Sequence, residues 1–167
     1  EKQEVVKDDG KPYTVFTPYS RRWKATLQKE HLHSYPSEKL LQACASYQGA
    51  DFPTLAAIGF SSSGIAFPSS VWQTDTIKQY KERRDLPAIK GTTQLGVHLR
   101  FGTISVRSLA REAGSLNETF LNELIWRDFY HMILWHFPQV VGNSFKPAYD
   151  AIQWRNNPLE FQAWCEG

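Results

Sequence analysis

One stretch constrains the fold of this chain more than any other. It runs from Ser115 to Pro138 and reads SLNETFLNELIWRDFYHMILWHFP. Ser115 and Glu118 have the spacing of a capping box, and Pro138 cannot continue a helix, so the pattern predicts one long helix between them. Apolar residues recur within it at helical spacing and are expected to form the buried face. These residues are Leu116, Phe120, Leu121, Leu124, Ile125, Met132 and Ile133.

A second face of this predicted helix carries polar and aromatic side chains. Glu123, Trp126, Arg127 and Tyr130 stand at positions i, i+3, i+4 and i+7, which places them side by side. A carboxylate, an indole, a guanidinium and a phenol together can receive a flat, polar, anionic ligand. The same spacing is also typical of an ordinary helix with a surface ion pair and a half-buried tryptophan, so the residues alone leave both interpretations open.

The bulk composition argues against several classes of protein. A length of 167 residues fits one domain with a sizeable core, and a formal net charge of +2 gives no whole-chain field that attracts nucleic acid. Cys44 and Cys165 are far apart and are interpreted as reduced thiols, and no histidine spacing suits a metal site. Without a long apolar run or a signal peptide, we expect a cytoplasmic protein with no membrane span and no metal.

Breaker residues divide the rest of the chain. Residues Lys11–Thr17 are rich in β-branched and aromatic side chains and predict a short strand, which Pro18 ends before a helix over Tyr19–Glu30. Residues 31–70 are irregular and are interpreted as an interdomain linker, with a short turn of helix at Ser37–Ser46. Further helices are expected at Trp72–Glu82, Gln94–Phe101, Ser105–Ala113, where Gly114 would end the helix, and Pro158–Glu166.

A second candidate site lies in the segment Gly91–Gly96, which reads GTTQLG. Small hydroxyl residues just before a helix leave backbone N–H groups unpaired, and the helix dipole adds positive potential, which together favour phosphate binding. The alternative is that Thr92 or Thr93 is only the N-cap of the helix. The segment is not a Walker loop, and the chain contains no G-x-G-x-x-G motif.

Several segments, taken in order, resemble the DNA photolyase/cryptochrome family. NELIWRDFY at 122–130 resembles the family signature N-E-L-x-W-R-[ED]-F-Y, and HFP at 136–138 continues it. The other matching segments are PYTVFTPY at 12–19 with Trp23, DLP at 85–87, TTQL at 92–95, LRFGTIS at 99–105, QW at 153–154, NP at 157–158 and AWCEG at 163–167. The resemblance therefore covers nearly the whole chain.

The resemblance implies a mainly α fold. It identifies the chain as the N-terminal half of the helical FAD-binding domain of the photolyase fold, preceded by the last strand and helix of the antenna-binding α/β domain. In these terms residues 1–30 are the tail of the antenna domain, 31–70 the interdomain linker, and 71–167 the first part of the FAD-binding domain. Both ends look cut relative to the family, so we expect a central fragment.

The resemblance also implies a function, which is light-driven DNA repair in which reduced FAD splits cyclobutane pyrimidine dimers by electron transfer. Glu123 would hydrogen-bond the flipped dimer, Trp126 would stack on it, and Arg127 and Tyr130 would lie near the DNA backbone or the pocket wall. No catalytic residue is expected within the fragment. The residues expected to contact FAD are Tyr80, Thr92, Thr93, Gln94, Leu95 and Gly96, with Phe120 as a weaker contact at a position where relatives often carry Trp.

Two other functions remain open at this point. One is a flavin-binding cryptochrome photoreceptor of the same fold, which signals and does not repair. The other is a non-enzymatic helical interaction module. By the resemblance, the parent would be a monomer whose antenna pigment is not identified, because the pocket for that pigment is absent. The fragment itself is expected to be inactive and to self-associate through apolar faces that missing helices would cover.

Overall fold

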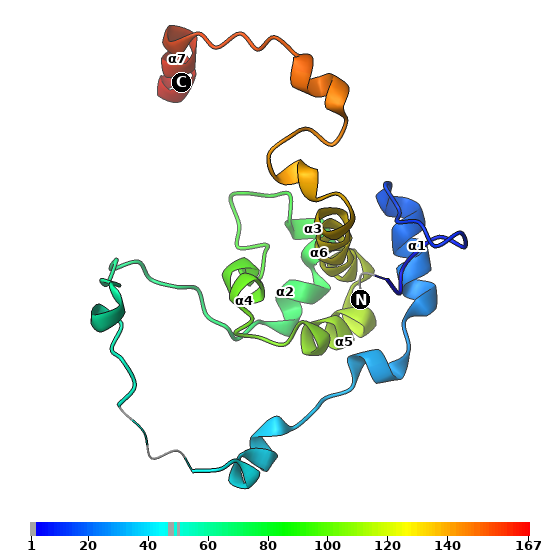
Figure 1. Cartoon of the computed structure of the whole chain (residues 1–167), viewed down its shortest axis with the longest axis vertical. Coiled ribbons are helices and arrows are strands. Elements are labelled where there is room, and N and C mark those ends of the chain that lie inside the picture. Colours follow the sequence, from blue (N-terminus) through cyan, green and yellow to red (C-terminus); the bar gives the residue numbers. More distant parts are fainter. Residues whose placement is uncertain (1–2, 47–48, 50) are drawn as a thin grey trace. The chain divides into compact units, whose positions relative to one another are not determined.

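The structure, a computed structural model, describes residues 3–46, 49 and 51–167. All regular secondary structure in these residues is helical, as Figure 1 shows. The chain forms two compact units, of which the first comprises residues 1–23 and 126–167 and the second residues 24–125. The long helix α6 (Glu118–His136) is unbroken and contributes residues to both units.

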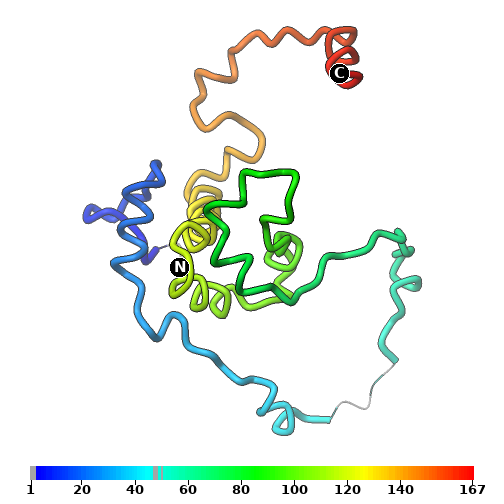
Figure 2. The backbone as a smooth tube through the Cα atoms, turned by 180° about the vertical axis from the view of Figure 1, so that it is seen from behind, coloured from blue at the N-terminus to red at the C-terminus, as the bar shows by residue number. Residues whose placement is uncertain are grey.

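The second unit is built from short helices that connect into the first part of α6, and the backbone trace in Figure 2 follows these connections. Its core contains Ile77, Leu109 and Ile125, which are fully buried. Glu112 holds the start of α2, because its carboxylate accepts hydrogen bonds from Trp72 Nε1 and Thr74 Oγ1, both at 2.8 Å. The helices are α2 (Thr74–Lys78), α3 (Tyr80–Arg83), α4 (Gly96–Phe101) and α5 (Val106–Leu116).

The predicted capping box of the long helix is wrong. Ser115 lies in the last turn of α5, where its hydroxyl donates to the Glu112 carbonyl at 2.9 Å. Helix α6 begins at Glu118, and the preceding Asn117 caps it by accepting the Phe120 N–H at 3.1 Å. The expected end of α5 at Gly114 is wrong for the same reason: the chain turns at Asn117, whose extended backbone separates the two helices.

The predicted buried face of α6 is confirmed in large part. Leu116 and Ile133 are only half-buried, and Phe129, which the periodicity analysis did not include, is buried at 6% exposure. The predicted residues that are buried are Phe120, Leu121, Leu124, Ile125 and Met132. Hydrophobic periodicity therefore located the core-facing side of the helix, because burial of one apolar stripe stabilises a helix more than its intrinsic propensity does.

The first unit contains most of helix α1 (Phe16–Thr26) and no strand among its described residues. The strand predicted for 11–17 is wrong: residues 11–15 form no β-strand, and α1 already begins at Phe16. A strand needs a partner strand, and none is present in the described part of the chain. Pro18 is tolerated in the first turn of α1 because the N–H groups of that turn have no intrahelical partner.

Three further elements of the first unit follow α6. They are η4 (Pro138–Val141), η5 (Pro147–Ala151) and α7 (Pro158–Glu166). The last helix has the predicted bounds, and Asn157 caps it by accepting the N–H groups of Leu159 and Glu160. Pro158 at its first position agrees with the preference for proline at helix starts.

The described residues within 31–70 are mostly irregular and exposed, as the sequence predicts. The turn expected at Ser37–Ser46 is present as η2 (Ser37–Ala43). The other short elements near this segment are η1 (Lys29–Leu32) and η3 (Ala56–Ile58). His98 Nε2 lies 2.8 Å from the Pro68 carbonyl oxygen and so attaches the end of the segment to α4. The role of the segment as an interdomain linker stays a prediction.

Candidate functional site

A cluster of four side chains in the second unit brings together residues from both predicted binding sets. The ring of Tyr80 lies edge-on against Phe120, with 5.0 Å between centroids and 88° between planes. The Arg84 guanidinium lies 5.7 Å from the centre of the Tyr80 ring and forms an ion pair with Glu123. The cluster therefore joins two predicted FAD contacts to a predicted lesion contact through one arginine.

Sequence reasoning assigned Arg84 to neither the cofactor contacts nor the lesion contacts. One available signal was its spacing from Tyr80, because residues at i and i+4 of a helical segment are neighbours. The helix α3 that begins at Tyr80 ends at Arg83, and Arg84 follows it in α-helical backbone conformation, so the two side chains meet on one side. The other half of its environment, Glu123, lies 39 positions away and is brought close only by packing.

The charges of this cluster reinforce its arrangement. Burial is the main cause that raises the pKa of the Tyr80 phenol, and the Glu123 carboxylate adds to this while Arg84 opposes it. Loss of solvation lowers the pKa of Arg84, but Glu123, Asp85 and Tyr80 together raise it by more, so the net shift of this pKa is upward. The cluster thus presents a neutral phenol and a charged, partly solvated ion pair, which suits a polar ligand better than an apolar one.

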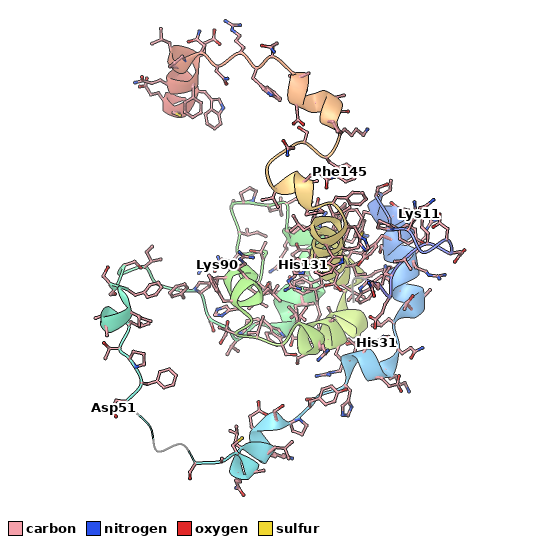
Figure 3. All side chains as sticks on the ribbon, viewed as in Figure 1. Lys11, His31, Asp51, Lys90, His131 and Phe145 are labelled. Carbon is pink, nitrogen blue, oxygen red and sulfur yellow. The ribbon has the colours of Figure 1, made fainter. Side chains whose placement is uncertain are left out.

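The loop before α4 has a constrained backbone. Gly91 is buried, and a Cβ at this position would lie 2.3 Å from the Arg83 carbonyl oxygen. Gln94 has a φ of +55°, which a non-glycine residue adopts at a conformational cost. Figure 3 labels Lys90 at the entrance to this loop. Both features make the turn tight and fix the direction of the backbone that follows.

The predicted FAD contacts of this loop differ in their exposure. Thr92, Gln94 and Gly96 are exposed, Thr93 is half-buried, and Leu95 is buried at 2% exposure, so Leu95 belongs to the core. The N-cap position of α4 is Leu95, which corrects the expectation that Thr92 or Thr93 caps this helix and that the helix begins at Gln94. With only six residues, α4 supplies little dipole to the site.

Unpaired polar groups nevertheless remain in this unit. The backbone N–H groups of Thr92, Thr93 and Gln94 donate to no other residue that the structure describes. Unpaired amides of this kind suit the phosphate groups of a nucleotide cofactor such as FAD.

A second unpaired polar group lies on α6. The Oδ1 atom of Asn122 is buried and has no hydrogen-bond partner among the described residues. Buried acceptors in proteins are almost always hydrogen-bonded, so a donor such as water or a ligand is expected to bind here.

Aromatic rings surround Trp126 in the first unit. Tyr130 stacks on it at 5.5 Å and 22°, and Phe129 lies edge-on at 5.6 Å. Phe16, from α1, is parallel to the indole at 3.6 Å and 4°. The structure therefore brings together the predicted lesion contacts Trp126 and Tyr130, and it adds Phe16, which sequence reasoning missed. Arg127 is half-buried and lies 3.7 Å from the carboxylate of Asp128.

A separate cavity of about 320 Å³ lies in the first unit. Asp128, on α6, accepts a hydrogen bond from Trp23 Nε1 at 3.1 Å, and Figure 3 labels the neighbouring His131 on the same helix. Burial, with a smaller contribution from Asp128, raises the pKa of Tyr19. No residue predicted as a site from the sequence lines this cavity. Its lining residues are Val5, Tyr19, Trp23, Asp128, His131, Met132 and Trp135.

Two other kinds of feature are absent from the described residues. No group of three or more His, Cys, Asp or Glu side chains is arranged to hold a metal ion. No described helix is both long and apolar enough to cross a membrane.

Known proteins resemble this chain along its whole length. Residues 120–167 match the family described as the FAD binding domain of DNA photolyase. The chain is 32% identical to the deoxyribodipyrimidine photo-lyase of Alkalihalophilus pseudofirmus, in an alignment that covers 100% of the chain and 38% of that protein. The chain is therefore similar to DNA photolyases, and its C-terminal part matches their FAD binding domain. The mainly α fold expected from the resemblance is confirmed by the helices of the structure.

Two other photolyases are also similar to this chain. The deoxyribodipyrimidine photo-lyase of Halobacterium salinarum is 30% identical over 98% of this chain and 39% of its own length. That of Neurospora crassa is 40% identical over 56% of this chain and 17% of its own length. The chain thus spans about two-fifths of the length of the photolyases that it matches end to end.

Proposed function

We propose that this chain forms part of the FAD- and lesion-binding region of a deoxyribodipyrimidine photo-lyase, which acts on UV-damaged DNA in the cytoplasm. The names of its relatives and the match to the FAD binding domain support this proposal. When bound, reduced FAD would supply the light-driven electron that opens a cyclobutane pyrimidine dimer. The residues of this chain would bind and orient the cofactor and the lesion.

The observation that carries the proposal is the cluster Tyr80–Arg84–Glu123. One guanidinium contacts a phenol from the cofactor set and a carboxylate from the lesion set. Because Arg84 contacts both Tyr80 and Glu123, it fixes the orientation of both side chains. A site that holds a cofactor and a lesion close together would need such fixed side chains. Arg84 would thus be a positioning residue, and Glu123 would offer its carboxylate to the hydrogen-bond donors of a flipped base.

The remaining cofactor contacts divide by role. The free amides of Thr92, Thr93 and Gln94 would bind the FAD phosphates, and the Thr93 hydroxyl would add a donor. No atom lies within 4 Å of the position of a Cβ at Gly96, so the backbone there is open to a ligand. Leu95 and Phe120 would support the site from the core, since both are buried.

The lesion contacts would act by stacking and by charge. Trp126 would stack on the extruded base, an interaction worth about 1–3 kcal/mol per base. Flipping a base out of a duplex costs a few kcal/mol, least for a damaged pair, so this contribution is large enough to matter. Tyr130 would extend the stacking surface, and Arg127 would contact the DNA backbone.

A titration of the purified chain with FAD, followed by flavin fluorescence polarisation, tests the proposal. We expect a saturable rise in polarisation. Tyr80→Ala and Thr93→Ala should each weaken binding by up to about 10-fold, the worth of one hydrogen bond or ring contact. Tyr149→Ala is the matched control, because this tyrosine lies 53% exposed in the other unit. No saturable rise, or equal loss in the control, would contradict the proposal.

A further inference from the structure

The ring of Phe16 lies flat against one face of Trp126. The two ring centres are 3.6 Å apart and the planes differ by 4°. At that separation the rings overlap almost fully, because parallel aromatic rings cannot approach much more closely than this. Two aromatic side chains prefer an offset or edge-on arrangement, whereas a flat stack is how a nucleobase lies on an indole. Phe16 therefore has the geometry of a stacked base.

Two neighbouring rings contact Trp126 directly, and one of them, Phe129, also lies edge-on to Phe16 at 5.9 Å. Phe129 is buried and lies edge-on to Trp126 at 5.6 Å and to Tyr19 at 5.2 Å. Tyr130 stacks at 5.5 Å. If Phe16 moved away, the indole would keep these contacts and would expose one flat face. That face is the surface that a base would need.

The turn of α1 that carries Phe16 is its least stable part. Pro18 disfavours helical backbone at Thr17, lacks an N–H group, and belongs to a turn whose other N–H groups have no intrahelical partner. Val15, just before the helix, is 59% exposed. Two turns further on, Trp23 Nε1 donates to Asp128 at 3.1 Å and holds the helix to α6. The first turn can therefore unwind while the rest of α1 stays attached.

We propose that Phe16 is an internal plug, which occupies the base-stacking face of Trp126 and must leave before a flipped base can stack there. This inference rests on the proposed function, because it takes Trp126 as the residue that stacks on the base. Binding of a base and docking of the first turn of α1 are then mutually exclusive. Displacing the Phe16 ring costs free energy, and this cost weakens the binding of DNA to the chain.

The test measures binding of a fluorescently labelled single-stranded oligothymidylate that carries one cyclobutane thymine dimer. Phe16→Ala should bind it about 3- to 10-fold more tightly than the unaltered chain, which is the worth of one aromatic pair. Phe16→Leu, which keeps apolar bulk but has no flat ring, should give a smaller gain. Tyr13→Ala is the control: its ring lies edge-on to Tyr19 at 6.2 Å, and binding should not change.

Trp126→Ala separates this inference from the proposed function. It should weaken binding and abolish the gain produced by Phe16→Ala. If Trp126→Ala binds as well as the unaltered chain, the stacking role in the proposed function is wrong. If Trp126→Ala weakens binding but Phe16→Ala gives no gain, the plug is wrong and the stacking role stands. Absence of binding by both the unaltered chain and Phe16→Ala also contradicts the plug.

Hydrogen exchange on the unaltered chain gives a measurement that needs no variant. Saturation with the dimer-containing oligonucleotide should speed exchange of the Tyr19 and Ser20 amides, because the first turn of α1 is released. An undamaged oligonucleotide at the same concentration should have a smaller effect. Unchanged or slower exchange at these amides would overturn the inference.

Discussion

At the scale of single residues, the predicted cofactor contacts and the predicted lesion contacts meet at Arg84. This residue belongs to no motif by which the chain resembles photolyases, yet it contacts both Tyr80 and Glu123. Its ion pair is partly solvated, with side-chain exposures of 35% and 38%, so it contributes modestly to stability. Its importance is geometric, because one planar guanidinium fixes two neighbouring groups.

Gly91 is the residue whose replacement should be most costly in the loop before α4. A Cβ there would lie 2.3 Å from the Arg83 carbonyl oxygen, so Gly91→Ala must shift backbone. We expect a loss of about 1–3 kcal/mol in the free energy of unfolding, measured by urea denaturation. Gly96→Ala is the control, because nothing lies within 4 Å of its Cβ position and alanine favours the helix it starts. Equal stability of the two variants would contradict this reading of the loop.

At the scale of elements, the junction between α5 and α6 depends on one side chain. Asn117 Oδ1 accepts the Phe120 N–H, while its Nδ2 donates to the Lys78 carbonyl at 2.9 Å. The residue therefore starts the long helix and also ties it to the end of α2.

Asn117→Ala should lower the free energy of unfolding by about 1–2 kcal/mol, since it removes a helix cap and a second hydrogen bond. Ser115→Ala should cost only a few tenths of a kcal/mol, because its exposed hydroxyl bonds to a carbonyl within its own helix. Thermal and urea denaturation, read by circular dichroism, compare the two. A larger loss from Ser115→Ala would restore the capping box that the sequence suggests.

At the scale of the whole molecule, apolar side chains are distributed unevenly. Large apolar residues between positions 35 and 71 are exposed, and Phe52 reaches 96% exposure. By contrast, Phe120 and Phe129 of α6 are buried. Exposed apolar surface of this extent is typical of a region that contacts something else, so self-association of the chain stays a prediction.

Limited digestion with chymotrypsin should reflect this distribution. We expect the first cuts after Leu41, Leu55 or Phe60, which are exposed and not followed by proline, because an exposed and irregular backbone enters a protease site more easily than a helix does. Cleavage after Phe120 and Phe129 should follow only on longer digestion. Mass spectrometry of the early products determines the order of the cleavages. Early cuts within α6 would show that the helix is less stable than the structure indicates.

The sequence by itself predicted the similarity to photolyases, the helical class, the end of α6 and most of its buried face. These follow from motifs and from apolar periodicity, which are local properties of the chain. Tertiary structure alone decided where α6 begins. It also replaced the predicted strand at 11–17 with irregular chain and the start of α1, and it brought Arg84 to Glu123 and Phe16 to Trp126. Such contacts join residues far apart in sequence, so only the packing of helices against one another determines them.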